Sequence, residues 1–298
     1  MQRNYRFLGA CSGWGAQIRS CESGPQELIN GLVEEKVFQE LKTDAQIEML
    51  FPLKMAKDEL IPLAKSLPLI HEFNLRLALA AARAIDQGEF PVSIGGDHSN
   101  AVGMWNGVRR ALSKKTSLPL GLIWIDAHMD GHVPETTPSG AWHGMPVANL
   151  LGYGEQCLAQ LTQKEPILLP ENLVYIGVRS FEEGEAALLE KLNVKIYFID
   201  EVKERGLGTV VKEAMERVAV RTGGFGVSLD IDVIDPEEAP GVGSPEPGGI
   251  AAKELISTLP FLVKDPRLVG FEMVEYNPER DIENKTRNLI FDLLRKVL

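Results

Sequence analysis

The sequence predicts an α/β protein with a mainly parallel central sheet that helices cover on both faces. Two observations lead to this fold class. Short apolar segments rich in β-branched and aromatic residues recur along the chain, and helix-patterned segments separate most of them. Crossovers of this length are what a chain needs to return a parallel strand to the same sheet. No linker interrupts the alternation, so we expect a single domain over residues 1–298.

The expected elements follow this alternation from the N-terminus onwards. A strand at 5–8 precedes a helix-patterned segment at 24–41, an apolar run at 47–53 and an Ala-rich amphipathic segment at 68–87. Buried strands are then expected at 90–94, 121–125, 172–176, 194–198, 225–229 and 268–271, and an amphipathic helix at 283–298.

Composition excludes several classes of protein. Hydrophobic residues make up 44% of the chain and charged residues 24%, which suits a soluble protein with a large core and no need of disulfides. The net charge of -11 disfavours nucleic acid and anionic membranes as partners. Three widely spaced cysteines, and a start without a signal-peptide pattern, favour the cytoplasm. No apolar run approaches the roughly 20 residues of a membrane span.

Clusters of carboxylates and histidines follow three of the expected strands. These clusters are Gly95-Gly96-Asp97-His98-Ser99, Asp126-Ala127-His128-Met129-Asp130 and Asp230-Ile231-Asp232. Ligands of open α/β sheets bind beyond the carboxyl ends of the strands, so all three clusters are expected on one rim. Alternate residues of an extended segment point the same way, which predicts that the charged side chains within each cluster converge.

Six side chains of these clusters are candidate metal ligands: His98, Asp126, His128, Asp130, Asp230 and Asp232. Carboxylates crowded together would raise one another's pKa values and repel unless cations neutralise them. Six ligands suit two ions that share bridging carboxylates, and such a pair can activate a water molecule for hydrolysis. An oxygen-rich set with two imidazoles favours Mn(II), with Ni, Co and Zn as alternatives.

Each cluster also has a purely structural interpretation when it is taken singly. Asp230 and Asp232 could be turn or helix caps, and His98 could be an ordinary residue of a glycine-containing turn. Three compatible clusters on one rim favour the metal centre.

In order and spacing, the segments 95–99, 126–130 and 228–236 resemble the three signature motifs of the ureohydrolases, the arginase and agmatinase family, with arginase as the closer form. The resemblance extends from the first strand to Pro278 and implies a three-layer α/β/α sandwich. It also implies two Mn²⁺ ions, hydrolysis of a guanidino group to urea and an amine by a metal-bridging hydroxide, and a homo-oligomer, either trimer or hexamer.

The resemblance assigns the ligands to two ions. By position, one ion would be held by His98, Asp126, Asp130 and Asp230, and the other by Asp126, His128, Asp230 and Asp232. Asp126 and Asp230 would therefore bridge the two ions.

The resemblance further implies catalytic roles for Asp130, His143 and Glu275. His143 occupies the place of a proton-shuttling histidine, and an ordinary imidazole pKa of about 6.5 suits that task. Glu275 matches the glutamate that pairs with the substrate guanidinium, a planar cation suited to a carboxylate. The alternatives are a loop histidine that only packs and an exposed glutamate of no special role.

The segment 135–146, ETTPSGAWHGMP, bears on the substrate. It is similar to the arginase form, in which hydroxyls at the positions of Thr137 and Ser139 receive an α-carboxylate. Agmatine lacks that carboxylate, so L-arginine is the favoured small-molecule substrate, hydrolysed to L-ornithine and urea.

Four positions depart from the arginase pattern: His132 and Ala141 replace asparagines, and Ser180 and Glu182 replace aspartates. Glu182 would bind the α-amino group, and its extra methylene matters in a positioned site. His132 could bind the substrate carboxylate or be a surface loop histidine. These departures keep guanidinobutyrate, formiminoglutamate and agmatine open as substrates.

Two further classes of function remain as alternatives. One is a metal-binding paralogue without turnover, which the complete ligand set argues against. The other is a dinuclear phosphatase, which would want an arginine or lysine near the ligands.

Overall fold

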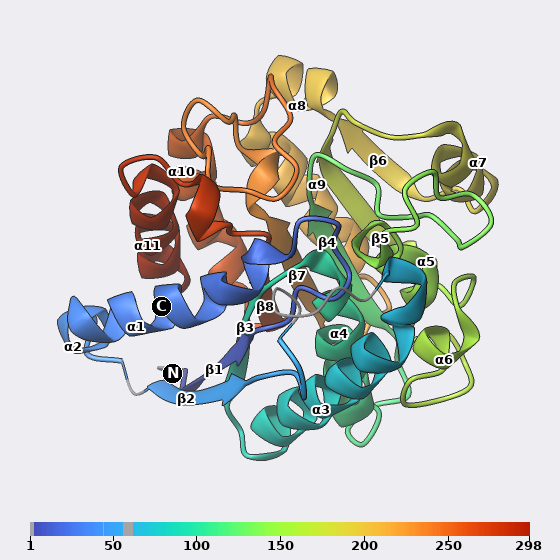
Figure 1. Cartoon of the computed structure of the whole chain (residues 1–298), viewed down its shortest axis with the longest axis horizontal. Coiled ribbons are helices and arrows are strands. Elements are labelled where there is room, and N and C mark those ends of the chain that lie inside the picture. The colour runs from blue at the N-terminus through green and yellow to red at the C-terminus, as the bar shows by residue number, and fades with distance from the viewer. Residues whose placement is uncertain (1–2, 44, 56–61) are drawn as a thin grey trace.

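The computed structural model describes residues 3–43, 45–55 and 62–298, and an eight-stranded sheet forms its centre (Figure 1). The strands are β1 (Tyr5–Ala10), β2 (Ala45–Leu50), β3 (Phe90–Gly95), β4 (Leu120–Ile125), β5 (Leu168–Val178), β6 (Lys195–Phe198), β7 (Phe225–Asp230) and β8 (Leu268–Val274). Their order across the sheet is β2-β1-β3-β8-β7-β4-β5-β6, and every neighbouring pair is parallel. The predicted parallel sheet is confirmed.

Helices cover both faces of the sheet. They are α1 (Gly24–Glu34), α2 (Val37–Glu40), α3 (Leu67–Asp86), α4 (Ala101–Leu112), α5 (Pro146–Leu150), α6 (Gln156–Ala159), α7 (Glu183–Lys191), α8 (Ile199–Arg205), α9 (Leu207–Ala219), α10 (Ala252–Val263) and α11 (Lys285–Val297). Among them, α1, α9, α10 and α11 share a core with one face of the sheet, and α3 and α4 with the opposite face.

The two cores follow from the alternation of side chains along each strand. In β4, Ile123 and Ile125 belong to the first core, whereas Leu122 and Trp124 belong to the second. Successive strand residues point to opposite faces, so a strand buried on both sides must be apolar throughout. This explains the continuous apolar runs, and the three-layer sandwich implied by the resemblance is confirmed.

Two expected helices have different bounds from those predicted. The segment expected to be one helix at 24–41 is divided, because Lys36 has a left-handed backbone with φ of 57° between α1 and α2. The last helix begins at Lys285, since Glu283 and Asn284 have φ of 53° and 57°. A left-handed residue cannot continue a right-handed helix.

The position of β8 decides what surrounds the expected site. Although β8 is the last strand in sequence, it lies between β3 and β7, so the residues that follow it reach the rim between the first and third clusters. Within the described ranges, we find no helix with the length and apolar character needed to cross a membrane.

Candidate metal centre

The ends of β3, β4 and β7 place the three clusters on one rim, and local hydrogen bonds fix their backbones. The Asp97 carboxylate accepts a hydrogen bond from the Ser99 N–H at 2.9 Å, where the 3-10 turn η4 (His98–Asn100) begins. The Asp230 carboxylate likewise accepts from the Asp232 N–H at 2.8 Å. Asp230 is therefore a cap, as the structural interpretation suggested, while its second oxygen faces the cluster.

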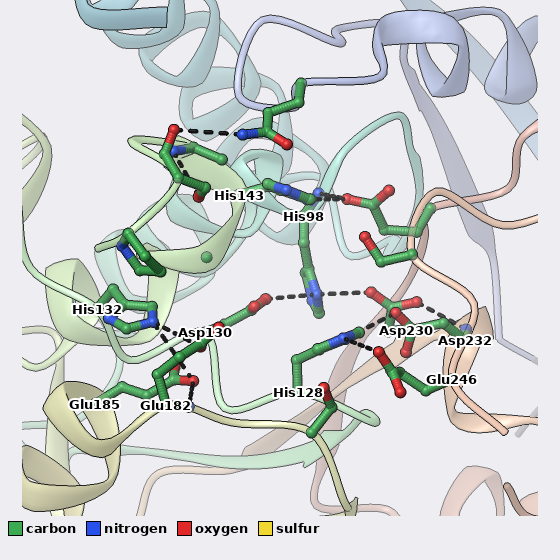
Figure 2. A pocket seen from close by; sticks show the side chains of 18 residues that line it. His98, His128, Asp130, His132, His143, Glu182, Glu185, Asp230, Asp232 and Glu246 are labelled. Carbon is green, nitrogen blue, oxygen red and sulfur yellow. Dashed lines mark hydrogen bonds and ion pairs between the residues drawn. The ribbon is translucent and has the colours of Figure 1, made fainter. Parts of the chain in front are cut away.

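One group of candidate ligands is centred on His98. Its Nδ1 lies 3.2 Å from Asp126 Oδ2, 3.0 Å from Asp130 Oδ2 and 3.1 Å from Asp230 Oδ2. The imidazole is buried, yet this nitrogen has no hydrogen bond of acceptable geometry in the described part of the chain. Figure 2 shows Asp130 and Asp230 on opposite sides of the ring. Three carboxylate oxygens that converge on a buried, unpaired nitrogen are the donor set of a cation.

A second group lies beside the first and contains His128. The His128 Nδ1 is 3.0 Å from Asp232 Oδ2 and 3.6 Å from Asp126 Oδ1. Ligand atoms of His98, Asp126 and Asp230 lie within 4.8 Å of one another, as do those of Asp126, His128 and Asp232. Asp126 belongs to both groups, as a bridging carboxylate must, whereas Asp230 belongs to the first of them.

The carboxyl groups of the cluster titrate as crowded anions do. Burial and the neighbouring Asp126 charge raise the pKa of Asp130 to about 6. Burial and Asp232 raise the pKa of Asp230 well above its ordinary value, and burial also raises the pKa of Asp232. Burial opposes ionisation of Asp126 too, but hydrogen bonds from the two histidines outweigh it and lower its pKa. The expectation of raised pKa values is therefore confirmed for three carboxyls and wrong for Asp126.

Residues within the strands hold His98 in place. The ring stacks on Trp124 with centroids 4.1 Å apart, and the Trp124 indole N–H donates to Asp126 Oδ2 at 2.8 Å. On its other side, His98 Nε2 lies 3.0 Å from Ser228 Oγ, which donates to Glu272 Oε2 at 2.8 Å. Such outer partners orient a ligating imidazole. Sequence reasoning missed them because each sits inside an apolar strand and resembles any other core position.

His143 and Glu275 meet beside the cluster. His143 Nδ1 lies 2.9 Å from Glu275 Oε1, and the same oxygen accepts the His98 N–H at 2.8 Å. Burial by itself would lower the pKa of His143, but the Glu275 carboxylate raises it to about 9. Glu275 is buried, so the alternative of an exposed glutamate is wrong.

These side chains line one cavity of about 270 Å³, which Figure 2 views from close by. Its floor carries His98, His128, Asp130, Asp230, Asp232 and Glu275. Among its described lining residues there is no lysine or arginine, and acidic groups predominate. The phosphatase alternative therefore lacks the arginine or lysine in this cavity that would receive a phosphate.

Comparisons with known proteins agree with this geometry. The Arginase family model matches residues 3–298. The arginase of Bacillus caldovelox is 36% identical over 293 residues, and the match covers 97% of this chain and 95% of that protein. The arginase of Brevibacillus brevis is 34% identical over 300 residues, and the match covers 100% of this chain and 98% of that protein. The crystal structure of arginase from Bacillus subtilis superposes with a TM-score of 0.89 at 31% identity, covering 99% of this chain and 98% of its own.

The chain belongs to the arginase family. The resemblance of its three motifs is thereby confirmed, and the protein is a metal-dependent hydrolase of the ureohydrolase type.

His132, at the outer end of this arginase-family pocket, has protein partners on both ring nitrogens. Its Nδ1 lies 3.0 Å from Thr136 Oγ1, and its Nε2 lies 3.0 Å from Glu182 Oε2 and 3.6 Å from Glu185 Oε1. The side chain is buried, so the alternative of a surface loop histidine is wrong. In this state no ring nitrogen of His132 is free to meet a substrate carboxylate.

The hydroxyls expected to bind a carboxylate lie in the neighbouring loop. Ser139 lines the cavity, and its Oγ accepts the N–H of Ala141 at 3.1 Å. Thr137 Oγ1 accepts the N–H of Gly140 at 3.1 Å, and Thr137 is not among the described lining residues. Ala141, Ser180 and Glu182 line the cavity as His132 does, so all four departures from the arginase pattern face the same space.

The structure adds lining residues that sequence reasoning did not single out. Glu185 caps α7 together with Glu182, and this spacing of three residues before a helix could have indicated it. Glu246 and Ser244 come from the loop at 241–249. Glu246 Oε1 lies 3.8 Å from His128 Nε2. The loop's glycines and prolines gave no signal of a lining carboxylate.

Proposed function

We propose that this arginase-family protein hydrolyses L-arginine to L-ornithine and urea with two divalent metal ions. The observation that carries the proposal is the juxtaposition of two donor groups sharing Asp126 with the His143–Glu275 pair in a single cavity. Metal-assisted hydrolysis needs a metal pair, a partner for the cationic group and a proton donor, and the cavity offers residues for each role.

The donor sets fit divalent ions. His98, Asp126, Asp130 and Asp230 would hold one ion, and Asp126, His128, Asp230 and Asp232 the other, with Asp126 and Asp230 as bridges. When bound, the ions supply a Lewis acid and lower the pKa of a water molecule toward neutrality. Four carboxylates and two imidazoles support manganese as the metal.

Glu275 is placed to receive the guanidinium group. Its carboxylate is buried at the cavity floor, and the His98 N–H fixes one of its oxygens at 2.8 Å. A guanidinium donates paired N–H bonds to a carboxylate, which would hold the substrate's central carbon toward the metal donors. The Glu182 carboxylate, whose pKa is lowered by the hydrogen bond with His132, suits the α-ammonium group, and the Ser139 hydroxyl suits the α-carboxylate.

His143 is the candidate proton donor. With a pKa raised to about 9 by Glu275, its ring carries a proton near neutral pH. The leaving amine requires a proton when the bond between carbon and nitrogen breaks, and a positioned imidazolium can supply it. Glu275 therefore both binds the substrate and keeps the donor charged.

The deciding experiment measures urea and amine from the purified protein reconstituted with Mn²⁺, with L-arginine, agmatine, guanidinobutyrate and formiminoglutamate as substrates. We expect L-arginine to give the highest kcat/KM, and a chelated sample to give no product. The His128→Asn variant should lose at least about a hundredfold in rate because a ligand of the second group is removed. Full activity in that variant would refute the two-metal mechanism, and no product from any substrate would support the paralogue without turnover.

Another guanidino or formimino acid is the second candidate substrate, and the engagement of His132 favours it. Both ring nitrogens of His132 have protein partners, and Ala141 has no side-chain hydrogen-bond donor. This part of the cavity therefore offers few donors to the α-carboxylate of an α-amino acid such as L-arginine. We expect His132→Asn to raise kcat/KM for L-arginine relative to the other compounds by several-fold. Equal ratios across the substrate panel in the variant and the wild type would exclude this role.

The assembly and location of the protein are also proposals. The three free thiols support a reducing compartment, the cytoplasm. Because both cores rest on one sheet, we propose a single domain over 1–298, and the family resemblance supports a trimer or hexamer. Light scattering would measure the oligomeric mass.

A further inference from the structure

Cys21 lies directly behind the residue that we assign to the guanidinium. It belongs to the 3-10 turn η1 (Arg19–Ser23), and its side chain is fully buried. Its Sγ is 3.3 Å from Glu275 Oε2 and 3.6 Å from the Glu275 carbonyl oxygen. The contact joins residues 254 positions apart, and it engages the carboxylate oxygen that the His98 N–H does not use.

The thiol is the donor in this contact. Burial and the nearby Glu275 carboxylate raise the pKa of Cys21 well above its ordinary value, so the sulfur keeps its proton. A carboxylate oxygen can only accept, and the hydrogen bond therefore runs from Cys21 S–H to Glu275 Oε2.

The two oxygens of Glu275 have different partners. Oε1 accepts the His98 N–H at 2.8 Å and lies 2.9 Å from His143 Nδ1. Within the described chain, the hydrogen bond to Oε2 comes from Cys21. Gly243 borders the same oxygen, and a Cβ at this glycine would overlap it. Oε2 thus sits between a glycine that leaves it room and a thiol that holds it.

A carboxylate fixed at one oxygen can still rotate about its last bond, because the terminal torsion of glutamate is broad. Paired hydrogen bonds to a planar guanidinium require both oxygens in the plane of the ligand. The second restraint on Oε2 removes that rotation before the substrate arrives.

We propose that Cys21 is a positioning residue for guanidinium binding, which holds the Glu275 carboxylate in the orientation that the substrate needs. This inference rests on the proposed function in assigning the guanidinium to Glu275. It predicts an effect on binding, since the hydrogen bond is present before the reaction and does not touch the reacting atoms.

A role in hydrogen bonding and a role in packing predict opposite results for two variants. Cys21→Ser retains a donor and loses some volume, whereas Cys21→Val fills the space and has no donor. If the hydrogen bond matters, serine preserves binding and valine impairs it; if packing matters, the order is reversed. Cys21→Ala is a second donor-free variant, should valine prevent folding.

The experiment compares these variants as Mn²⁺-loaded full-length protein at constant ionic strength. It measures KM and kcat for L-arginine, the Kd of the guanidinium ion by calorimetry, and bound metal. We expect Cys21→Val and Cys21→Ala to raise KM and Kd by about three- to tenfold, the usual effect of one lost hydrogen bond, with kcat changed less than twofold. Cys21→Ser should stay within twofold of the wild type.

Cys11 provides the matched control. Its thiol is also fully buried, but it hydrogen bonds to the backbone of Gln26. Cys11→Val should leave KM and Kd unchanged. Wild-type Kd in both donor-free Cys21 variants, or weaker binding in Cys21→Ser than in Cys21→Val, would overturn the proposal.

The guanidinium measurement separates this inference from the proposed function. If the wild type binds guanidinium but hydrolyses none of the four compounds, the proposed function fails while the Kd values still decide the role of Cys21. If the metal-loaded wild type binds no guanidinium, the assignment of Glu275 is wrong and the role of Cys21 falls with it.

Discussion

At the scale of single residues, the site depends on side chains and backbones held in uncommon states. Asp130 and Glu275 both have left-handed backbones, with φ of 50° and 67°, although neither is glycine. Such conformations cost of order 1 kcal/mol each and persist where surrounding structure enforces them. Glu275 directly follows β8, Asp130 lies five residues beyond β4, and both side chains line the cavity. The strain is thus tied to the orientation that the chemistry requires.

The His143–Glu275 pair predicts a pH dependence of stability for the metal-free protein. The pKa of His143 is raised to about 9 in the folded state, above the ordinary value of about 6.5. The pair therefore stabilises the folded state fully below about pH 6.5. This stabilisation is lost as the pH rises through about 9. With chelator present, the difference in Tm between wild type and His143→Asn should be largest near pH 6 and vanish toward pH 10. Calorimetry from pH 6 to 10 measures it, and a constant difference would contradict the prediction.

At the scale of elements, β7 connects the metal cluster to the helix layer behind it. Its Gly226 packs against the Trp105 ring of α4, and a Cβ at this glycine would overlap that ring. The Trp105 indole N–H donates to Glu272 Oε2 at 2.9 Å, and Glu272 in turn accepts from Ser228 behind His98. Three hydrogen-bonded side chains, Trp105, Glu272 and Ser228, therefore connect this packing contact to the candidate ligand His98.

Gly226→Ala should test this connection. Because the added methyl group must displace Trp105, we expect a loss of about 1–3 kcal/mol in the free energy of unfolding and weaker binding of Mn²⁺. Gly208→Ala in α9 is the control, since a Cβ there meets no atom within 4 Å. It should leave metal binding intact and change stability by less than about 1 kcal/mol. Urea unfolding and metal titration measure both, and equal behaviour of the two variants would refute the connection.

At the scale of the whole molecule, the metal centre joins strands from distant parts of the chain. The candidate ligands follow or end β3, β4 and β7, and their carboxyl groups have raised pKa values apart from that of Asp126. Ions that bind the folded state and not the unfolded chain stabilise the fold by mass action.

Metal removal should therefore lower the melting temperature. At a metal concentration about 100 times Kd, binding contributes about 2.7 kcal/mol, which for a chain of this size corresponds to roughly 4 °C. The shift between Mn²⁺-loaded and chelated protein should shrink in His128→Asn and remain in His71→Asn, a helix residue outside the cavity lining. Differential scanning calorimetry provides the comparison. A Tm unaffected by chelator would show that the centre contributes nothing to stability.

The sequence by itself determined the layered fold and the ligand clusters. Apolar runs with crossovers between them predict parallel strands. His98, Asp126 and Asp230 lie at the end of such runs or within three residues of it, so the geometry of a parallel sheet predicts that they converge. The break at Lys36 and the two left-handed residues before α11 escaped prediction, because any side chain can occupy that conformation where tertiary contacts compensate for it.

Only the tertiary structure decided which residues surround the ligands. The insertion of β8 between β3 and β7 brings Glu275 to His98 and Cys21, and the packing of α7 brings Glu182 and Glu185 to His132. Local periodicity reports which face of an element is buried, but not which strands become neighbours. Strand order is set by the burial of both sheet faces over the whole chain. The convergence of the candidate metal ligands could therefore be predicted from the sequence, whereas the thiol beside Glu275 and the partners of His132 could not.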